Sequence, residues 1–164
     1  MEWWTLPAVA GFGLILGSFL NALLYRYNTG RSVVSGRSKC MHCGHTLGAL
    51  ALIPVLSHLL VRGKCRYCHS RISPQYLLVE VAAAVLAVLV YMRTPELAAF
   101  ALSFCFFLTL LFIVVYDLRH QIIPWSASGV VAGLALLHVL LNDPSFFAFA
   151  AGPLLAAPLL LLSL

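Results

Sequence analysis

The chain has 164 residues, of which 62% are hydrophobic and only 9% are charged, and its mean hydropathy is +0.99. This composition excludes an ordinary soluble globular domain and indicates a polytopic, all-α membrane protein. Ten basic residues against five acidic ones give a formal charge of +5, but the positions of the basic residues indicate membrane topology and not nucleic-acid binding.

Most of the basic residues lie in one hydrophilic segment between the first two apolar runs. Short loops rich in Lys and Arg stay on the cytoplasmic side of a membrane, so this segment is expected to face the cytosol. The residues that set this expectation are Arg26, Arg31, Arg37, Lys39, Arg62, Lys64, Arg66 and Arg71.

The first apolar run, residues 3–24, is long enough to span a bilayer. No basic region precedes it and basic residues follow it, which argues against a signal peptide and places the N-terminus outside the cytosol. Gly11, Gly13 and Gly17 predict close approach of a neighbouring helix. Ser18 and Asn21 lie one turn apart, and this shared face favours contact between helices, with substrate contact as the alternative.

The hydrophilic segment carries two Cys-x-x-Cys pairs, Cys40 with Cys43 and Cys65 with Cys68. Two such turns supply the four sulfur ligands of a tetrahedral zinc ion, and the spacing between the pairs is typical of zinc sites. Iron is an alternative because sulfur ligands do not exclude it. Two disulfides or four unrelated thiols are further alternatives, and a reducing cytosol argues against the disulfides.

Between the two pairs, residues 47–61 are apolar but too short to cross a bilayer, so they are expected to lie on the membrane surface or against the helices. A second span is predicted over residues 76–92, with Glu80 one turn inside its cytosolic end. A carboxyl at this depth is a candidate functional group, although a structural role, such as pairing with an arginine of the loop, is favoured.

A third span is predicted over residues 97–116, in which Cys105 is interpreted as a small apolar side chain. Asp117 closes this run and is placed by the topology on the cytosolic face. Partial desolvation is expected to raise the pKa of its carboxyl, which suits proton transfer. The alternative is an interfacial charge paired with Arg119.

A fourth span is predicted over residues 125–141, with His138 interpreted as interfacial and Asp143 as a turn residue. A fifth begins at residue 146 and continues to residue 164 without a polar flank, which suggests a truncated chain. The predicted organisation is therefore a first helix at 1–25, a zinc-binding loop at 26–75, and spans two to five at 76–164.

Four segments together resemble the prepilin peptidases, the type IV leader peptidase family of membrane aspartic proteases. The resemblance rests on residues 17–21 with Tyr25 and Arg26, residues 37–45, residues 53–57 and 60–68 continuing to Glu80, and residues 117–124.

The resemblance implies a bacterial inner-membrane endopeptidase that cuts the basic leader from prepilins or pseudopilins at the cytosolic surface. It implies that Asp117 is one of two aspartates that activate a water molecule, and that Cys40, Cys43, Cys65 and Cys68 hold zinc. Many members of the family also methylate the new amino terminus with S-adenosylmethionine.

Two departures from the family pattern limit these implications. The family's second aspartate lies in a Gly-x-Gly-Asp motif that these 164 residues lack, so this chain alone is expected to be inactive. Residues 48–52 lack the aromatic and polar residues that are common in the family, which leaves methylation open. The alternative function is a noncatalytic membrane scaffold whose zinc loop docks a partner in pilus or secretion-system assembly.

Overall fold

The computed structural model describes residues 4–30, 32, 38–46, 48 and 53–142. Within these residues the elements are α1 (Thr5–Arg26), α2 (Leu56–Leu60), α3 (Gln75–Arg93), α4 (Leu97–His120) and α5 (Trp125–Asn142). Extended pairing in this part of the chain is limited to two isolated bridges, Lys39 with Thr46 and Lys64 with Arg71. The predicted all-α class is confirmed.

Three of the described helices, α1, α3 and α4, are long and apolar enough to cross a membrane. Helix α5 occupies the predicted fourth span and is also apolar, but it is shorter than these three helices. The predicted fifth span lies outside the described residues. The chain is therefore a multi-pass helical membrane protein, with helices at the first four predicted positions.

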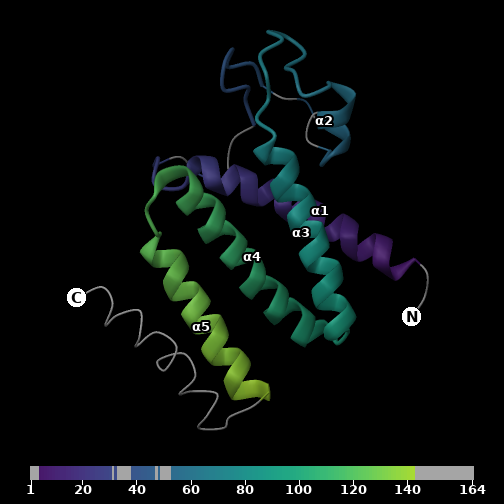
Figure 1. Cartoon of the computed structure of the whole chain (residues 1–164), viewed down its shortest axis with the longest axis vertical. Helices are drawn as coiled ribbons and strands as arrows, with labels where there is room; N and C mark the ends of the chain where they lie inside the picture. The colour runs from purple at the N-terminus through teal and green to yellow at the C-terminus, as the bar shows by residue number, and fades with distance from the viewer. Residues whose placement is uncertain (1–3, 31, 33–37, 47, 49–52, 143–164) are drawn as a thin grey trace.

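The long helices bring three helix termini to one end of the molecule (Figure 1). Helix α1 crosses α3 obliquely, while α4 and α5 follow α3 along the layer. The end of α1, the start of α3 and the end of α4 lie toward the same end, which also carries the loop with α2. The topology therefore places the two Cys-x-x-Cys pairs and Asp117 at one end of the helical layer.

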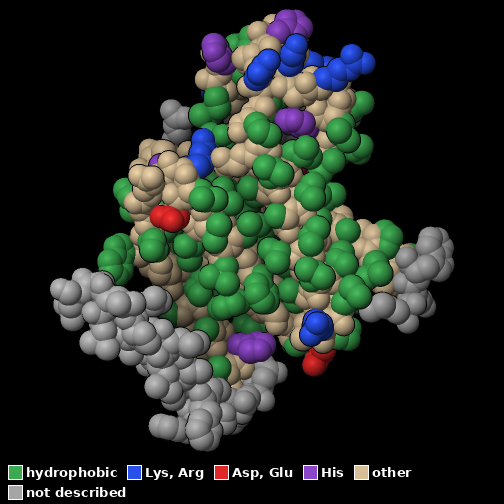
Figure 2. All heavy atoms as spheres, in the orientation of Figure 1, with side chains coloured by type: hydrophobic (Ala, Val, Ile, Leu, Met, Phe, Trp, Pro, Cys, Tyr) green, Lys and Arg blue, Asp and Glu red, His purple; other side chains and the backbone are tan. Residues whose placement is uncertain are grey.

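Two clusters of buried side chains hold the helices together, one toward each end of the layer. The cluster nearer the loop consists of Leu20, Leu24, Val79, Phe112, Tyr116 and Ala127. The other consists of Ala87, Val90, Phe100 and Phe104. Many remaining apolar side chains of the long helices are exposed (Figure 2), as expected of surfaces that face lipid.

Glycines allow α1 and α3 to approach closely. A Cβ built on Gly13 would lie 2.6 Å from the Ala84 Cα, and one on Gly17 would lie 2.8 Å from the Glu80 Cα. The close approach predicted at Gly13 and Gly17 is confirmed. The same prediction was wrong for Gly11, which has nothing described within 4 Å, because residues two apart on a helix do not share a face.

We expect Gly13→Ala to weaken the folded state by about 1–3 kcal/mol, because the added methyl meets backbone atoms of α3 that cannot rotate away. Gly11→Ala is the matched control, since it makes the same change on the same helix in open space. Both variants gain equal helix propensity, so their difference isolates the contact. Thermal unfolding of both in detergent micelles measures it, and equal stability would contradict the close approach.

Candidate functional site

The two Cys-x-x-Cys pairs form two turns with the same backbone pattern. In the first turn, the Gly44 N–H donates to the Cys40 carbonyl over 2.9 Å, and the Cys40 N–H donates to the His45 carbonyl over 2.9 Å. In the second turn, the His69 N–H donates to the Cys65 carbonyl over 3.0 Å, and the Cys65 N–H donates to the Ser70 carbonyl over 2.9 Å. The repeated sequence motif therefore folds into a repeated structure.

The fourth position after the leading cysteine has a left-handed backbone in both turns. Gly44 occupies it in the first turn with φ +71°, and His69 occupies it in the second with φ +56°. Glycine adopts this conformation readily, whereas a residue with a Cβ is strained there. The repeated motif predicts this shared turn geometry, because His69 takes the same position after Cys65 as Gly44 takes after Cys40.

The two turns bring the four sulfur atoms of Cys40, Cys43, Cys65 and Cys68 within 4.8 Å of one another. Cys40 Sγ and Cys68 Sγ lie 3.9 Å apart. Sulfurs bound at about 2.3 Å to a tetrahedral zinc ion lie about 3.8 Å apart, so the cluster fits such an ion. The predicted grouping of these four residues in one site is confirmed, and the site could hold a metal ion.

The electrostatics of the cluster also suit a cation. The backbone N–H groups of Cys43 and His42 lower the pKa of the Cys40 thiol to about 6. The His45 N–H lowers the pKa of Cys43, but desolvation and the neighbouring sulfurs outweigh it and raise that pKa to about 11. The Cys40 and Cys43 thiols thus affect each other's ionisation, and a bound cation would favour the thiolate form of its sulfur ligands.

A buried carboxylate ties the loop to the helices. Glu80 is 7% exposed, and its Oε2 accepts a hydrogen bond of 2.8 Å from the backbone N–H of Val55, which precedes α2. Glu80 packs beside Gly17 of α1 at the same level. The structural role favoured from sequence is borne out by this contact, but the partner is a backbone group and not an arginine of the loop.

Asp117 lies in the last turn of α4, where its carbonyl accepts the Gln121 N–H over 2.7 Å. Its side chain is exposed in the described structure, and its predicted desolvation stays a prediction. The helix dipole disfavours a carboxylate at a C-terminus, so helix stability does not explain an acidic residue here.

Arg119 contacts an aromatic ring of α1 and so links α4 to the other helix ends. Its Cζ lies 4.4 Å from the centroid of the Tyr25 ring, and Tyr25 stacks on Tyr76 of α3 with 5.0 Å between centroids. Asn21 adds a hydrogen bond of 2.9 Å to the Tyr76 carbonyl, which is the helix contact favoured from sequence. The alternative pairing of Arg119 with Asp117 is not the contact that the structure shows.

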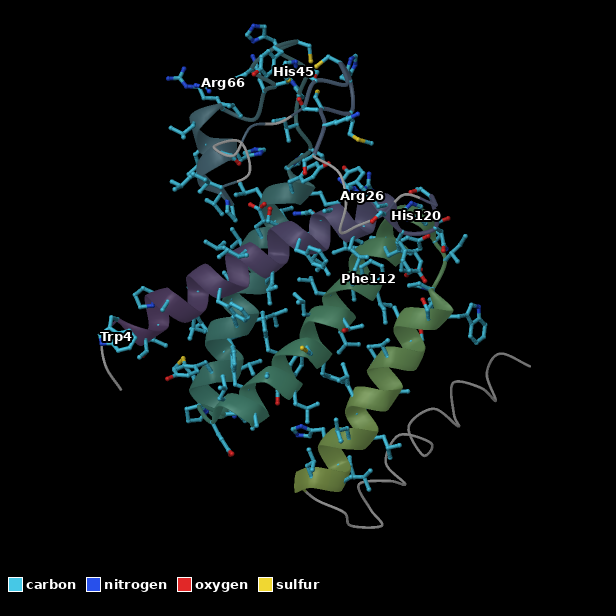
Figure 3. The ribbon with its side chains drawn as sticks, turned by 180° about the vertical axis from the view of Figure 1, so that it is seen from behind. Trp4, Arg26, His45, Arg66, Phe112 and His120 are labelled. Carbon is cyan, nitrogen blue, oxygen red and sulfur yellow. The ribbon has the colours of Figure 1, made fainter. Side chains whose placement is uncertain are left out.

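A second group of aromatic side chains packs at the same end of the helical layer. Tyr27 packs edge-on against Phe112 and Tyr116, and its hydroxyl shares a hydrogen bond with Ser126 of α5. Figure 3 shows Arg26 and His120 at this end, beneath the loop that carries His45 and Arg66, with Trp4 at the far end of α1. These contacts fix the helix end that bears Asp117 against α1, α3 and α5.

The fold and the site together define a multi-pass helical membrane protein with a four-cysteine metal-binding loop between α1 and α3. The chain belongs to the family of the bacterial peptidase A24 N-terminal domain, whose family model matches residues 12–94, about half of the chain. The match covers most of α1, the loop and α3, and it ends before α4.

Curated relatives extend the similarity beyond this domain. The chain is 33% identical over 160 residues to a prepilin leader peptidase/N-methyltransferase of Dichelobacter nodosus, covering 80% of this chain and 55% of the relative. It is 40% identical over 129 residues to one from Myxococcus xanthus, covering 76% of this chain and 38% of the relative. It is 31% identical over 151 residues to one from Vibrio cholerae, covering 87% of this chain and 59% of the relative. The chain spans about half the length of such relatives. No solved structure matches it significantly.

Proposed function

We propose that this chain is part of a membrane aspartic endopeptidase that removes the basic leader from type IV prepilins or pseudopilins. The observation that carries the proposal is the placement of Asp117 at the same end of the helical layer as the four-cysteine loop. The family match and the names of the relatives support the substrate class.

In this proposal Asp117 exchanges a proton with the water that attacks the scissile carbonyl. Two carboxyls that share one proton divide the work, one as base toward the water and the other as acid toward the carbonyl oxygen. The family's second aspartate lies in a Gly-x-Gly-Asp motif, and these 164 residues contain no such motif. Activity is therefore proposed only for a protein in which this second aspartate is also present.

The side chains around Asp117 suit a substrate that is partly embedded in the membrane. Leu118, Ile122 and Trp125, which follow it in the sequence, are exposed, with Trp125 91% exposed. The hydrophobic stretch of a prepilin could pack against such side chains, while its charged leader stays in the cytosol. In this proposal the scissile bond would lie near the level of the last turn of α4.

The four cysteines would hold zinc in this proposal, and the closed set of sulfur ligands makes zinc a crosslink of the loop and not a site for water. The names of the relatives also include N-methyltransferase. We extend the proposal to methylation by S-adenosylmethionine without assigning residues to it, because residues 49–52 lie outside the described structure.

The test is cleavage of a prepilin by membranes that contain the complete gene product. We expect a prepilin with its natural basic leader to be cut to a shorter product. Replacing the lysines and arginines of the leader with glutamine should slow this cleavage. A complete absence of cleavage, with the metal loop intact and the prepilin bound, would favour the noncatalytic scaffold.

A further inference from the structure

The metal-binding loop also forms a basic cavity beside the cysteine cluster. The cavity has a volume of about 250 Å³, and its polar lining includes Arg62, Lys64 and Arg66. None of its lining residues is acidic, and within the described part of the chain these three cations have no ion pair. The cavity therefore concentrates positive charge without an internal counterion.

An apolar surface adjoins this cavity on α2. Leu56, Leu59 and Leu60 are exposed, with Leu60 77% exposed, and Leu60 also lines the cavity. Figure 2 shows the Lys and Arg side chains gathered at the end of the molecule that carries the loop, with hydrophobic side chains below them. The loop thus combines exposed leucines with a cationic cavity, a pattern typical of segments that lie in a membrane interface.

The Val55–Glu80 hydrogen bond sets the depth of this surface. Glu80 lies five residues beyond the start of α3, which corresponds to about 7.5 Å along the helix axis. Val55 directly precedes α2, so α2 starts beside α3, and Arg62, Lys64 and Arg66 follow α2 in the chain. We therefore expect the leucines of α2 to lie near the depth at which the predicted span begins, with the cations toward the headgroup side.

We propose that this cavity binds the phosphate of an anionic membrane lipid while the leucines of α2 enter the upper acyl layer. The positive cavity would repel a basic peptide leader, so it is a site separate from the peptide site. The exposed leucines favour a lipid over a soluble phosphate compound, because only a lipid also covers apolar surface. This inference goes beyond the proposed function and does not depend on peptidase activity.

The experiment uses the 164-residue chain in nanodiscs of phosphatidylcholine alone or of equal parts phosphatidylcholine and phosphatidylglycerol. Hydrogen exchange of residues 56–66 is the readout. We expect slower exchange with phosphatidylglycerol, and loss of this difference in a variant with Arg62→Gln and Lys64→Gln. The matched control is Lys39→Gln with Arg71→Gln, which removes the same charge from the same loop outside the cavity lining.

Three results would overturn the proposal. Exchange could be equal in both lipid mixtures, or the two double variants could lose the difference equally, which would indicate a general charge effect. Inorganic phosphate added to the detergent-solubilised chain could also give the same slowing, which would assign the cavity to soluble anions. Metal content measured in each variant shows that the loop remains folded.

Discussion

Replacing Cys65 with serine is expected to abolish stoichiometric metal binding and to unfold the loop between α1 and α3. Cys65 is the one buried member of the cluster, with 4% exposure, and its backbone makes two of the hydrogen bonds of the second turn. Structural zinc sites contribute about 10 kcal/mol or more to the folding of small metal domains, and the described loop has little core of its own. Loss of one ligand should therefore remove most of the stability of the loop.

Metal content of the purified protein and hydrogen exchange of the Gly44 and His69 amides measure this effect. Cys105→Ser is the matched control, because Cys105 lies on α4 outside the cluster. A Cys65→Ser protein with full metal content and protected turns would show that the cluster does not crosslink the loop. Chelation of the wild-type metal should give the same unfolding, and unchanged exchange after chelation would contradict the crosslink.

Much of the fold could be predicted from the sequence because lipid imposes simple rules on it. Apolar runs of sufficient length predict the positions of four helices. The distribution of Lys and Arg predicts the loop between the first two membrane spans. The doubled Cys-x-x-Cys motif predicts the cysteine cluster, since each pair needs only one local turn to present two sulfurs. The helix ends shifted by a few residues, as for α1 (Thr5–Arg26) against the predicted 3–24.

The contacts that could not be predicted depend on which helix faces which. An arginine of the loop is the partner that the sequence suggests for Glu80, but the fold brings the Val55 N–H to it across 25 positions of sequence. Arg119 was considered a partner of Asp117, yet side chains two apart on a helix point in different directions, and Arg119 reaches Tyr25 instead. Helix α2 has five residues, too few to give a periodic signal.

These long-range contacts form a continuous series from the cysteine-bearing loop to the last turn of α4. Val55 and Glu80 join the loop to α3, Asn21 joins α3 to α1, and Tyr25 joins α1 to Arg119 in the last turn of α4. Each link is a single hydrogen bond or ring contact near the end of a helix. The loop that bears the cysteine cluster is therefore connected to the last turn of α4 through contacts of α3 and α1.

Asp117→Asn in the complete gene product is expected to lower prepilin cleavage by about 10²–10⁴-fold, the usual contribution of a general acid or base. Asparagine keeps the size of the side chain but cannot exchange a proton with water. Metal content and prepilin binding should stay unchanged, because Asp117 contributes no ligand to the cysteine cluster. Single-turnover cleavage of a prepilin in reconstituted membranes separates the chemical step from binding.

The matched control is Glu96→Gln, which removes a carboxyl from the opposite end of the same helix. We expect cleavage by this variant to be close to wild type, since a general loss of charge on α4 would affect both variants alike. Retained cleavage by Asp117→Asn would remove Asp117 from the mechanism. Equal loss in both variants would indicate instead that α4 tolerates no loss of charge at either end, and the catalytic assignment of Asp117 would fail.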